Sequence, residues 1–179
     1  MKALLVIDLQ RNVVAEAVDV ARVISKVNAL IEQARTVGSP LIFIQHQDEA
    51  VAAMTPGSPT WQFVDELDVR DGDVVVHKRH RDGFAGTELK ALLDAAGVTE
   101  VVVTGAQSDY CVQTTALSAL AQGFDITVVS DAHTTCATGP GYGSVEGAAV
   151  VEFINGHFYW LTYPGRAVTV ATAHEIQLQ

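Results

Sequence analysis

The chain has 179 residues, of which 49% are hydrophobic and 18% charged, and its formal net charge is −10. This length and composition predict one packed domain over residues 1–179 and exclude a disordered chain. An acidic surface repels phosphate groups and anionic lipid, so nucleic acids and membranes are not expected as partners.

Apolar runs alternate with amphipathic stretches, which is the pattern of a βαβ protein. Residues 3–7 are continuously apolar, as expected of a central parallel strand that is covered on both faces. Further strands are predicted at 41–44, 73–77, 100–104, 126–129 and 168–172, and helices at 18–37, 86–96, 110–122 and 144–154. Their sum is an α/β fold: a doubly wound, Rossmann-like parallel sheet of six strands with helices on both faces.

Two stretches are predicted as loops. Residues 49–70 have weak periodicity and contain Pro56-Gly57-Ser58-Pro59, and a long loop in a compact domain usually carries function. Residues 137–143 are rich in glycine. Cys136 adjoins this second loop and is expected to be structural rather than nucleophilic.

The opening of the chain passes from an apolar run to the carboxylate of Asp8, with no small-residue cleavage site after it. It therefore indicates a buried strand rather than a signal peptide, and no apolar run approaches the ~18 residues that a membrane-spanning helix needs. Cys111 and Cys136 could form a disulfide, but nothing else in the sequence indicates an oxidising compartment. We expect a cytoplasmic protein with reduced thiols.

Three reactive side chains fall at or just beyond the carboxyl ends of predicted strands, where doubly wound sheets bind their ligands. They are Asp8, Lys78 and Cys111. Each also has a structural explanation: Asp8 could cap the next segment, Lys78 could end a strand in solvent, and Cys111 could be a small core residue. Their meeting at one edge of the sheet favours catalysis.

The three residue types fit nucleophilic catalysis without histidine. Cys111 is predicted near a helix start, where backbone N–H groups and the helix dipole favour a thiolate, and the Lys78 ammonium would favour it further. Asp8 could take the thiol proton and return it to a departing amine. Backbone N–H groups of Cys111 and of the preceding turn would then form an oxyanion hole.

Three ordered blocks add to this: residues 3–10 (ALLVIDLQ), Lys78 with 84–89 (FAGTEL), and 103–112 (VTGAQSDYCV), which continues through 114–116 to 130–132. These blocks resemble the isochorismatase-like cysteine hydrolase family, which includes nicotinamidases and N-carbamoylsarcosine amidases. The resemblance implies the triad Asp8, Lys78 and Cys111. It also implies a cis peptide between Ala106 and Gln107 that turns the Gln107 N–H toward the Cys111 N–H as the oxyanion hole.

Nicotinamidases of that family bind a divalent ion just past the second strand. Here this segment offers only His46 and Asp48, and no further histidine follows until His77. Two ligands do not make a stable site, so we expect neither a metal nor another cofactor. His46 is instead expected in the wall of a pocket.

Four further residues are expected to line the substrate pocket, although each could be plain packing: Trp61, Phe84, Tyr110 and His133. The basic cluster at residues 77–81 is expected at the pocket mouth, where it would attract a polar or anionic group. A nucleic-acid patch is the alternative for this cluster.

The presence of Cys111 favours C–N hydrolysis, because isochorismatases proper, which cleave a vinyl ether, lack this cysteine. The sequence therefore predicts a metal-independent hydrolase of a small amide, lactam or ureide that acts through a thioester acyl-enzyme. Ester or vinyl ether hydrolysis on the same fold, and a non-catalytic binding relative, are the alternatives.

We also expect a homo-oligomer, a dimer or tetramer, as the resemblance implies. Six strands in 179 residues leave a thin helical covering, and the aromatic run Phe158-Tyr159-Trp160-Leu161 has no predicted strand or helix to bury it. A local core role for this run is the alternative.

Overall fold

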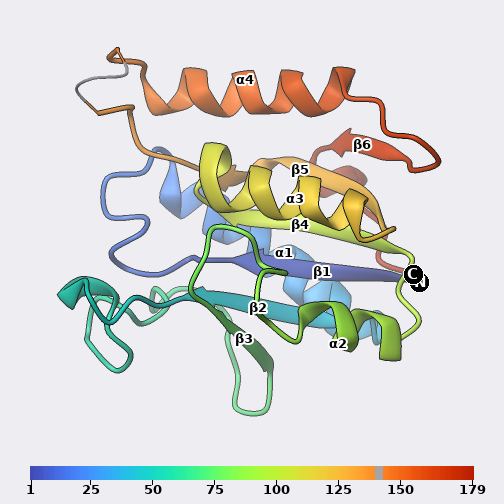
Figure 1. Ribbon diagram of the computed structural model, residues 1–179, viewed down its shortest axis with the longest axis horizontal. Helices are drawn as coiled ribbons and strands as arrows, with labels where there is room; N and C mark the ends of the chain where they lie inside the picture. Colours follow the sequence, from blue (N-terminus) through green and yellow to red (C-terminus); the bar gives the residue numbers. More distant parts are fainter. Residues whose placement is uncertain (140–142) are drawn as a thin grey trace.

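The computed structural model describes residues 1–139 and 143–179, so part of the predicted glycine-rich loop, residues 140–142, lies outside the described residues. All the predicted strands are present: β1 (Lys2–Ile7), β2 (Leu41–His46), β3 (Val74–Lys78), β4 (Glu100–Ala106), β5 (Asp125–Thr134) and β6 (Val168–Ala171). They form one six-stranded sheet in the order β3-β2-β1-β4-β5-β6, and every neighbouring pair is parallel (Figure 1).

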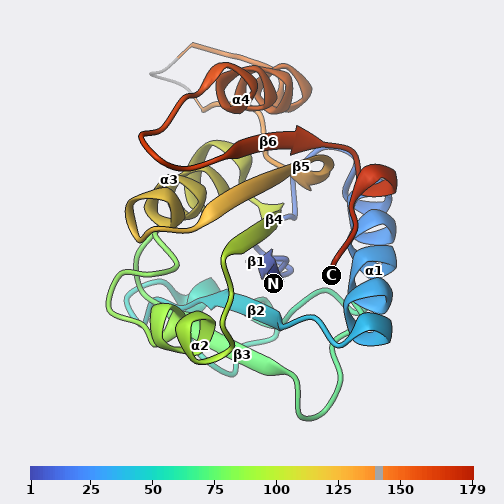
Figure 2. The same cartoon turned by 90° about the vertical axis from the view of Figure 1, so that its right-hand side faces the viewer.

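The four longer helices cover both faces of the sheet. Helix α1 (Val20–Val37) lies on one face, and α2 (Leu89–Ala95), α3 (Gln113–Ala121) and α4 (Gly147–Trp160) lie on the other (Figure 2). Short helical turns occupy Ala52–Met54, Ser108–Val112 and Ala173–Glu175. The predicted doubly wound α/β fold is therefore confirmed.

The core has two halves because the side chains of a strand point alternately to opposite faces. In β1, Leu4 and Val6 pack against the α1 side, whereas Leu5 and Ile7 pack against the side of α2, α3 and α4. All four side chains are fully buried. This explains why the strand is apolar throughout rather than alternating.

All four helices differ from their predicted bounds, and two of the differences bear on the site and on the aromatic run. Helix α4 continues to Trp160 because Val150, Ile154 and Phe158 recur every four residues and bury one face of it. The expectation that the aromatic run lies outside any helix was therefore wrong. The third helix begins later than predicted, and Cys111 lies in a π-helical turn that precedes it.

Gly105 lets β4 approach β1 closely at the end of the sheet. Its φ is +116°, and a Cβ there would overlap the Ile7 carbonyl oxygen. We expect Gly105→Ala to lower the free energy of unfolding by more than about 3 kcal/mol, because the new methyl group must displace backbone atoms. Urea unfolding would measure this.

Gly156→Ala is the matched control for that prediction. Gly156 lies inside α4, and open space surrounds the position of a Cβ there. In the single chain, alanine should therefore leave the free energy of unfolding unchanged or raise it by about 0.5–1 kcal/mol. Equal unfolding free energies for the two variants would contradict the role given to Gly105.

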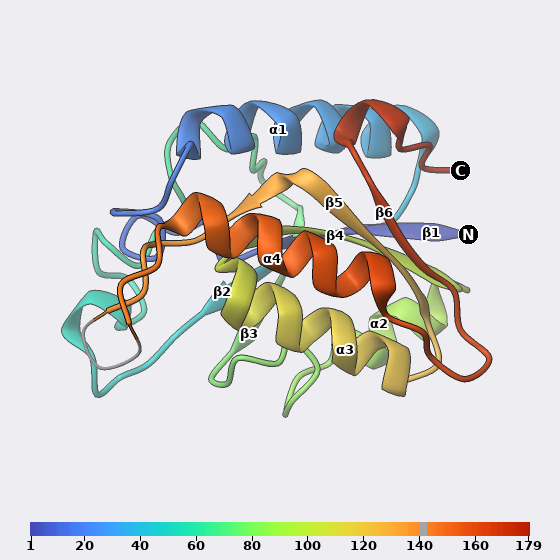
Figure 3. The same ribbon diagram turned by 90° about the horizontal axis from the view of Figure 1, so that it is seen from above.

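Strand order reverses at β1, whose neighbours β2 and β4 are reached by connections on opposite faces. Such a switch point opens a crevice beyond the carboxyl ends of the strands. Both chain termini lie at the other end of the sheet (Figures 1 and 3). Among the described helices, none has the length and apolar character required to cross a bilayer.

Candidate active site

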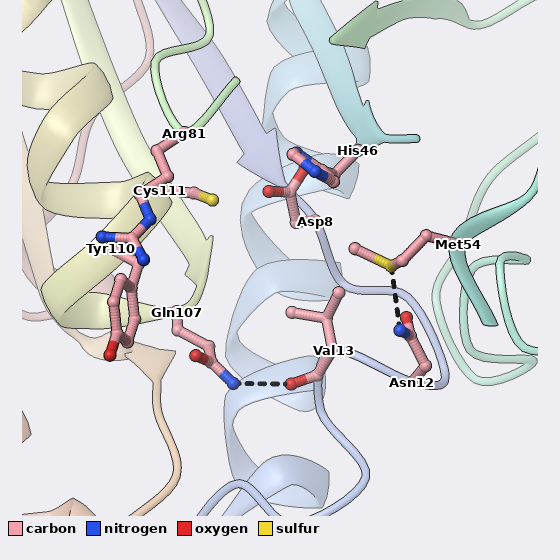
Figure 4. A pocket seen from close by; sticks show the side chains of 9 residues that line it. All are labelled: Asp8, Asn12, Val13, His46, Met54, Arg81, Gln107, Tyr110 and Cys111. Carbon is pink, nitrogen blue, oxygen red and sulfur yellow. Dashed lines mark hydrogen bonds between the residues drawn. The ribbon is translucent and has the colours of Figure 1, made fainter. Parts of the chain in front are cut away.

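Three side chains meet in the crevice at the switch point. Asp8 directly follows β1 with a φ of 48°, a left-handed conformation that aspartate tolerates better than most residues. Lys78 is the last residue of β3, and Cys111 follows β4 by five positions. Asp8 and Cys111 face each other across the pocket (Figure 4).

The Lys78 ammonium lies at the centre of this group. Its Nζ is 2.7 Å from Asp8 Oδ2, and both side chains are fully buried. It lies 3.2 Å from Cys111 Sγ, 3.0 Å from His46 Nδ1 and 3.0 Å from the carbonyl oxygen of His80. A buried charge needs such partners, so the lysine is held by the surrounding atoms.

The resting thiol is protonated. Burial, and after it the Asp8 carboxylate, raises the pKa of the Cys111 thiol to about 12, and the Lys78 ammonium lowers it by too little to compensate. Lys78 therefore acts on the thiol in the predicted direction, whereas burial and the Asp8 carboxylate act against it. The Asp8 carboxylate lies beside this thiol.

His46 is neutral in this setting. Burial and then the Lys78 ammonium lower its pKa below the ordinary value for histidine. Its Nδ1 therefore accepts a hydrogen bond from Lys78. The buried Gln10 side chain fixes the backbone of His46, since its amide donates to the His46 carbonyl oxygen and accepts from the His46 N–H.

The turn between β4 and Cys111 contains a cis peptide bond between Ala106 and Gln107, at the position that the family resemblance implies. The Gln107 side chain donates hydrogen bonds to the Val13 carbonyl oxygen at 3.0 Å and to Cys136 Sγ at 3.2 Å. Cys136 thus contacts a pocket residue without lining the pocket itself.

The pocket beside these three side chains has a volume of about 420 Å³, a size suited to a small molecule. Its lining residues come from the carboxyl ends of the strands and from the segments that follow them: Asp8, Asn12, Val13, His46, Met54, Arg81, Gln107, Tyr110 and Cys111 (Figure 4). His46 and Tyr110 were predicted there, and Arg81 belongs to the basic cluster expected at the mouth.

An Isochorismatase domain model matches residues 2–149 of the chain. The chain belongs to this family. Among curated relatives, the streptothricin hydrolase of Streptomyces noursei is 41% identical over 138 residues, which are 75% of this chain and 50% of that protein. The ureidoacrylate amidohydrolase RutB of Caulobacter segnis is 29% identical over 171 residues, 79% of this chain and 70% of that protein.

This isochorismatase-family chain spans about half the length of the first curated relatives that it matches. Among solved structures, an isochorismatase from Pseudomonas putida KT2440 has a TM-score of 0.87 at 24% sequence identity. The superposition covers 98% of this chain and 89% of the Pseudomonas chain. A protein of the family from Chromobacterium violaceum has a TM-score of 0.84 at 27% sequence identity, and the superposition covers 97% of this chain and 90% of that protein.

Three residues predicted to line the pocket of this isochorismatase-family protein do not line it. The Trp61 ring stacks on His77, with 5.7 Å between ring centroids. Phe84 is buried in the core against Phe124. His133 is buried behind the Cys111 turn, where its Nδ1 lies 2.7 Å from Ser108 Oγ and its Nε2 2.9 Å from Asn155 Oδ1.

Three residues that line the pocket were not predicted from the sequence: Asn12, Val13 and Met54. Asn12 and Val13 lie in the turn after β1, a few residues beyond Asp8, and carry no catalytic signature of their own. Met54 lies in the loop of residues 49–70, for which a functional role was predicted without naming a residue. Their only sequence signal is their position after a strand that ends at the switch point.

One group of the described residues has the spacing of a metal site. Asp8, His46 and Cys111 offer ligand atoms within 4.8 Å of one another. The Lys78 ammonium, however, already lies within 2.7–3.2 Å of an atom of each of them. A metal ion would have to share this space with a buried cation, so these residues do not fit a metal.

Asp48, the other ligand candidate beside His46, does not belong to this group. Its carboxylate accepts a hydrogen bond from the N–H of Ala50 at 2.8 Å.

Proposed function

We propose that this protein hydrolyses the C–N bond of a small amide, lactam or ureide, with Cys111 as nucleophile, Asp8 as general base and Lys78 as their cationic partner. The observation that carries the proposal is the convergence of the three side chains on Lys78 Nζ, 2.7 Å from Asp8 and 3.2 Å from Cys111, beside a pocket of about 420 Å³. The names of two relatives, a streptothricin hydrolase and a ureidoacrylate amidohydrolase, support it.

The first half of the reaction forms a thioester. Asp8 accepts the thiol proton while Cys111 Sγ attacks the carbonyl carbon, so that an S–C bond forms and the carbonyl electron pair moves onto oxygen. The backbone N–H groups of Gln107 and Cys111 would stabilise that oxyanion, as the family resemblance implies. The intermediate then collapses: the C–N bond breaks, and the amine leaves with the proton that Asp8 held.

The second half restores the thiol. Water gives a proton to Asp8 and attacks the thioester carbon, so that a C–O bond forms. The C–S bond breaks, and the proton returns from Asp8 to sulfur as the acid leaves. Throughout both halves, the Lys78 ammonium stays beside whichever partner is anionic, which lowers the cost of charge in a buried site.

The proposal includes independence from metal, because Lys78 supplies the positive charge at the site. The test is a panel of small amides, ureides and lactams with matched esters, assayed for product formation after dialysis against a strong chelator. We expect turnover of C–N substrates and the same rate with and without chelator. Turnover of esters alone would favour the alternative reaction, and restoration by zinc of a lost activity would contradict metal independence.

We further propose that α4 lies at an interface between copies of this chain. Phe153, Tyr159 and Trp160 on this helix are 71%, 68% and 80% exposed, and a groove of about 500 Å³ runs beside Phe153 and Trp160. Exposed aromatic side chains gathered on one helix are typical of contact surfaces.

Trp160→Glu should lower the mass measured by light scattering toward the 19.1 kDa of one chain, because the interface would have to bury a charge. Val37→Glu, at a 45% exposed valine of α1 on the other face of the sheet, should leave the mass unchanged. A monomeric wild-type protein at micromolar concentration would contradict this interface.

A further inference from the structure

The cationic side chains of this acidic protein are ion-paired, with one exception. All the lysines and every arginine except Arg81 lie within 3.7 Å of a carboxylate oxygen. Arg81 has no such partner in residues 1–139 and 143–179, and the three remaining residues, proline, glycine and tyrosine, carry no carboxylate. Arg81 is therefore the cation left available to a ligand.

Arg81 lines the pocket beside the nucleophile. Its guanidinium carbon lies over the Tyr110 ring, 4.1 Å from the centroid, and Tyr110 directly precedes Cys111 in the chain. The side chain extends past Cys111 toward Tyr110 on one wall, opposite Asp8 and His46 (Figure 4). Stacking on an aromatic ring orients the guanidinium while leaving its N–H groups free to donate.

The backbone that carries Arg81 is held on both sides. Lys78 Nζ donates to the His80 carbonyl oxygen at 3.0 Å, and the Gly83 N–H donates to Thr115 Oγ1 at 2.9 Å. The neighbouring Asp82 carboxylate is engaged elsewhere, since it accepts hydrogen bonds from the Phe84 N–H and from Ser118 Oγ.

The remaining charges of the pocket cancel. Asp8 is paired with Lys78 at 2.7 Å, and His46 accepts a hydrogen bond from the same ammonium. A ligand entering the pocket therefore meets one uncompensated positive charge, that of Arg81. A guanidinium matches a carboxylate with two parallel N–H···O bonds, which is the pairing that a single planar cation favours.

We infer that the substrate carries a carboxylate and that Arg81 binds it while the scissile carbonyl lies against Cys111. This inference rests on the proposed function and narrows its substrate class to small amides, lactams or ureides with an acidic group. Arg81 is then a specificity-determining residue.

Two alkylating reagents of similar size test the inference without a known substrate. Iodoacetate is anionic and iodoacetamide is neutral. With either one, Cys111 Sγ forms a bond to the methylene carbon, the C–I bond breaks, iodide leaves with the electron pair, and the thiol proton passes to Asp8. The rate of Cys111 modification by each reagent is followed by mass spectrometry, which also separates Cys111 from Cys136.

We expect Arg81→Gln to lower the ratio of the iodoacetate rate to the iodoacetamide rate by about tenfold, the value for a lost charge-assisted hydrogen bond. Arg81→Lys should lower it less, because the charge remains while the planar fork is lost. Arg79→Gln is the matched control: it removes the same charge two residues away, where Arg79 pairs with Glu49 at 2.8 Å, and should leave the ratio unchanged.

The outcomes separate the two proposals. An unchanged ratio in Arg81→Gln, or equal changes in the Arg81 and Arg79 variants, would overturn the carboxylate assignment and leave Cys111 as nucleophile. Modification of Cys136 alone would overturn the nucleophile and, with it, this inference. In the substrate panel, Arg81→Gln should raise KM for acids about tenfold and leave KM unchanged for their methyl esters at that group.

Discussion

Replacing Cys111 with alanine is expected to lower hydrolysis by at least about 10⁴-fold, since the proposed acyl-enzyme forms on this sulfur. The fold should persist, because alanine is smaller than cysteine and the side chain is only partly buried. The measurement is product release from the best substrate of the amide and ureide panel. Mass spectrometry after an acid quench should detect an acyl adduct on the wild-type protein but not on Cys111→Ala.

Cys136→Ser is the control for that experiment. Its sulfur accepts a hydrogen bond from the Gln107 side chain, and a hydroxyl group preserves an acceptor there. The activity of Cys136→Ser should stay within a few-fold of wild type, which is a small change compared with the fall expected for Cys111→Ala. Activity that survives Cys111→Ala and disappears in Cys136→Ser would show that the nucleophile is misassigned.

Asp8→Asn should change two quantities in opposite senses: the rate of hydrolysis should fall, and the fraction of Cys111 present as thiolate should rise. Hydrolysis should fall about 10²–10⁴-fold, because no base remains to accept the proton. The thiol should nevertheless ionise more readily: the Asp8 carboxylate is one of the causes that raise the pKa of Cys111, and removing it leaves the Lys78 ammonium to lower that pKa. Ultraviolet absorbance of the thiolate against pH measures the shift directly.

The direction in which the pKa of Cys111 changes in Asp8→Asn is the informative result. A loss of activity that came from a disturbed site would not be accompanied by a lower pKa of Cys111, and such a result would contradict the placement of the Asp8 carboxylate beside the thiol. Thermal unfolding must be followed in parallel, since the variant leaves the buried Lys78 without its ion pair, at a cost of about 3–5 kcal/mol. Asp48→Asn, outside the donor group around Lys78, should alter neither activity nor the thiol titration.

The meeting of Asp8, Lys78 and Cys111 could be predicted from the sequence because it depends mainly on the sheet. Asp8 and Lys78 are recognisable from the apolar runs of β1 and β3, and Cys111 follows the run of β4 closely. Parallel strands bring these ends to the same edge whatever the loops do. The α/β fold followed from the same runs, since connection rules leave few arrangements for six of them.

The pocket wall could not be predicted in the same way, because it depends on where loop side chains point. Trp61 and Phe84 are aromatic and lie near the right edge, yet one stacks on His77 and the other turns into the core. Asn12 and Met54 have no distinctive chemistry and nevertheless face the pocket. No periodic pattern encodes the direction of a side chain in an irregular segment.

The pKa of the Cys111 thiol could not be predicted from the sequence either. A helix start and a nearby lysine both favour a thiolate, and both are readable from residue order. Burial and the nearby Asp8 carboxylate raise the pKa of the thiol instead, and both arise only once the strands are assembled.

An ammonium nitrogen carries three hydrogens, whereas Lys78 Nζ faces four acceptors, on Asp8, His46, His80 and Cys111. Its three hydrogen bonds run to His46, His80 and Cys111, and Asp8 meets the ammonium as an ion pair. In the proposed reaction the proton moves from sulfur to Asp8, so the negative charge beside Lys78 moves from the carboxylate to a sulfur that the ammonium already contacts. Charge thus crosses the proposed site while the lysine nitrogen stays in place, a response that the planar hydrogens of an arginine could not give.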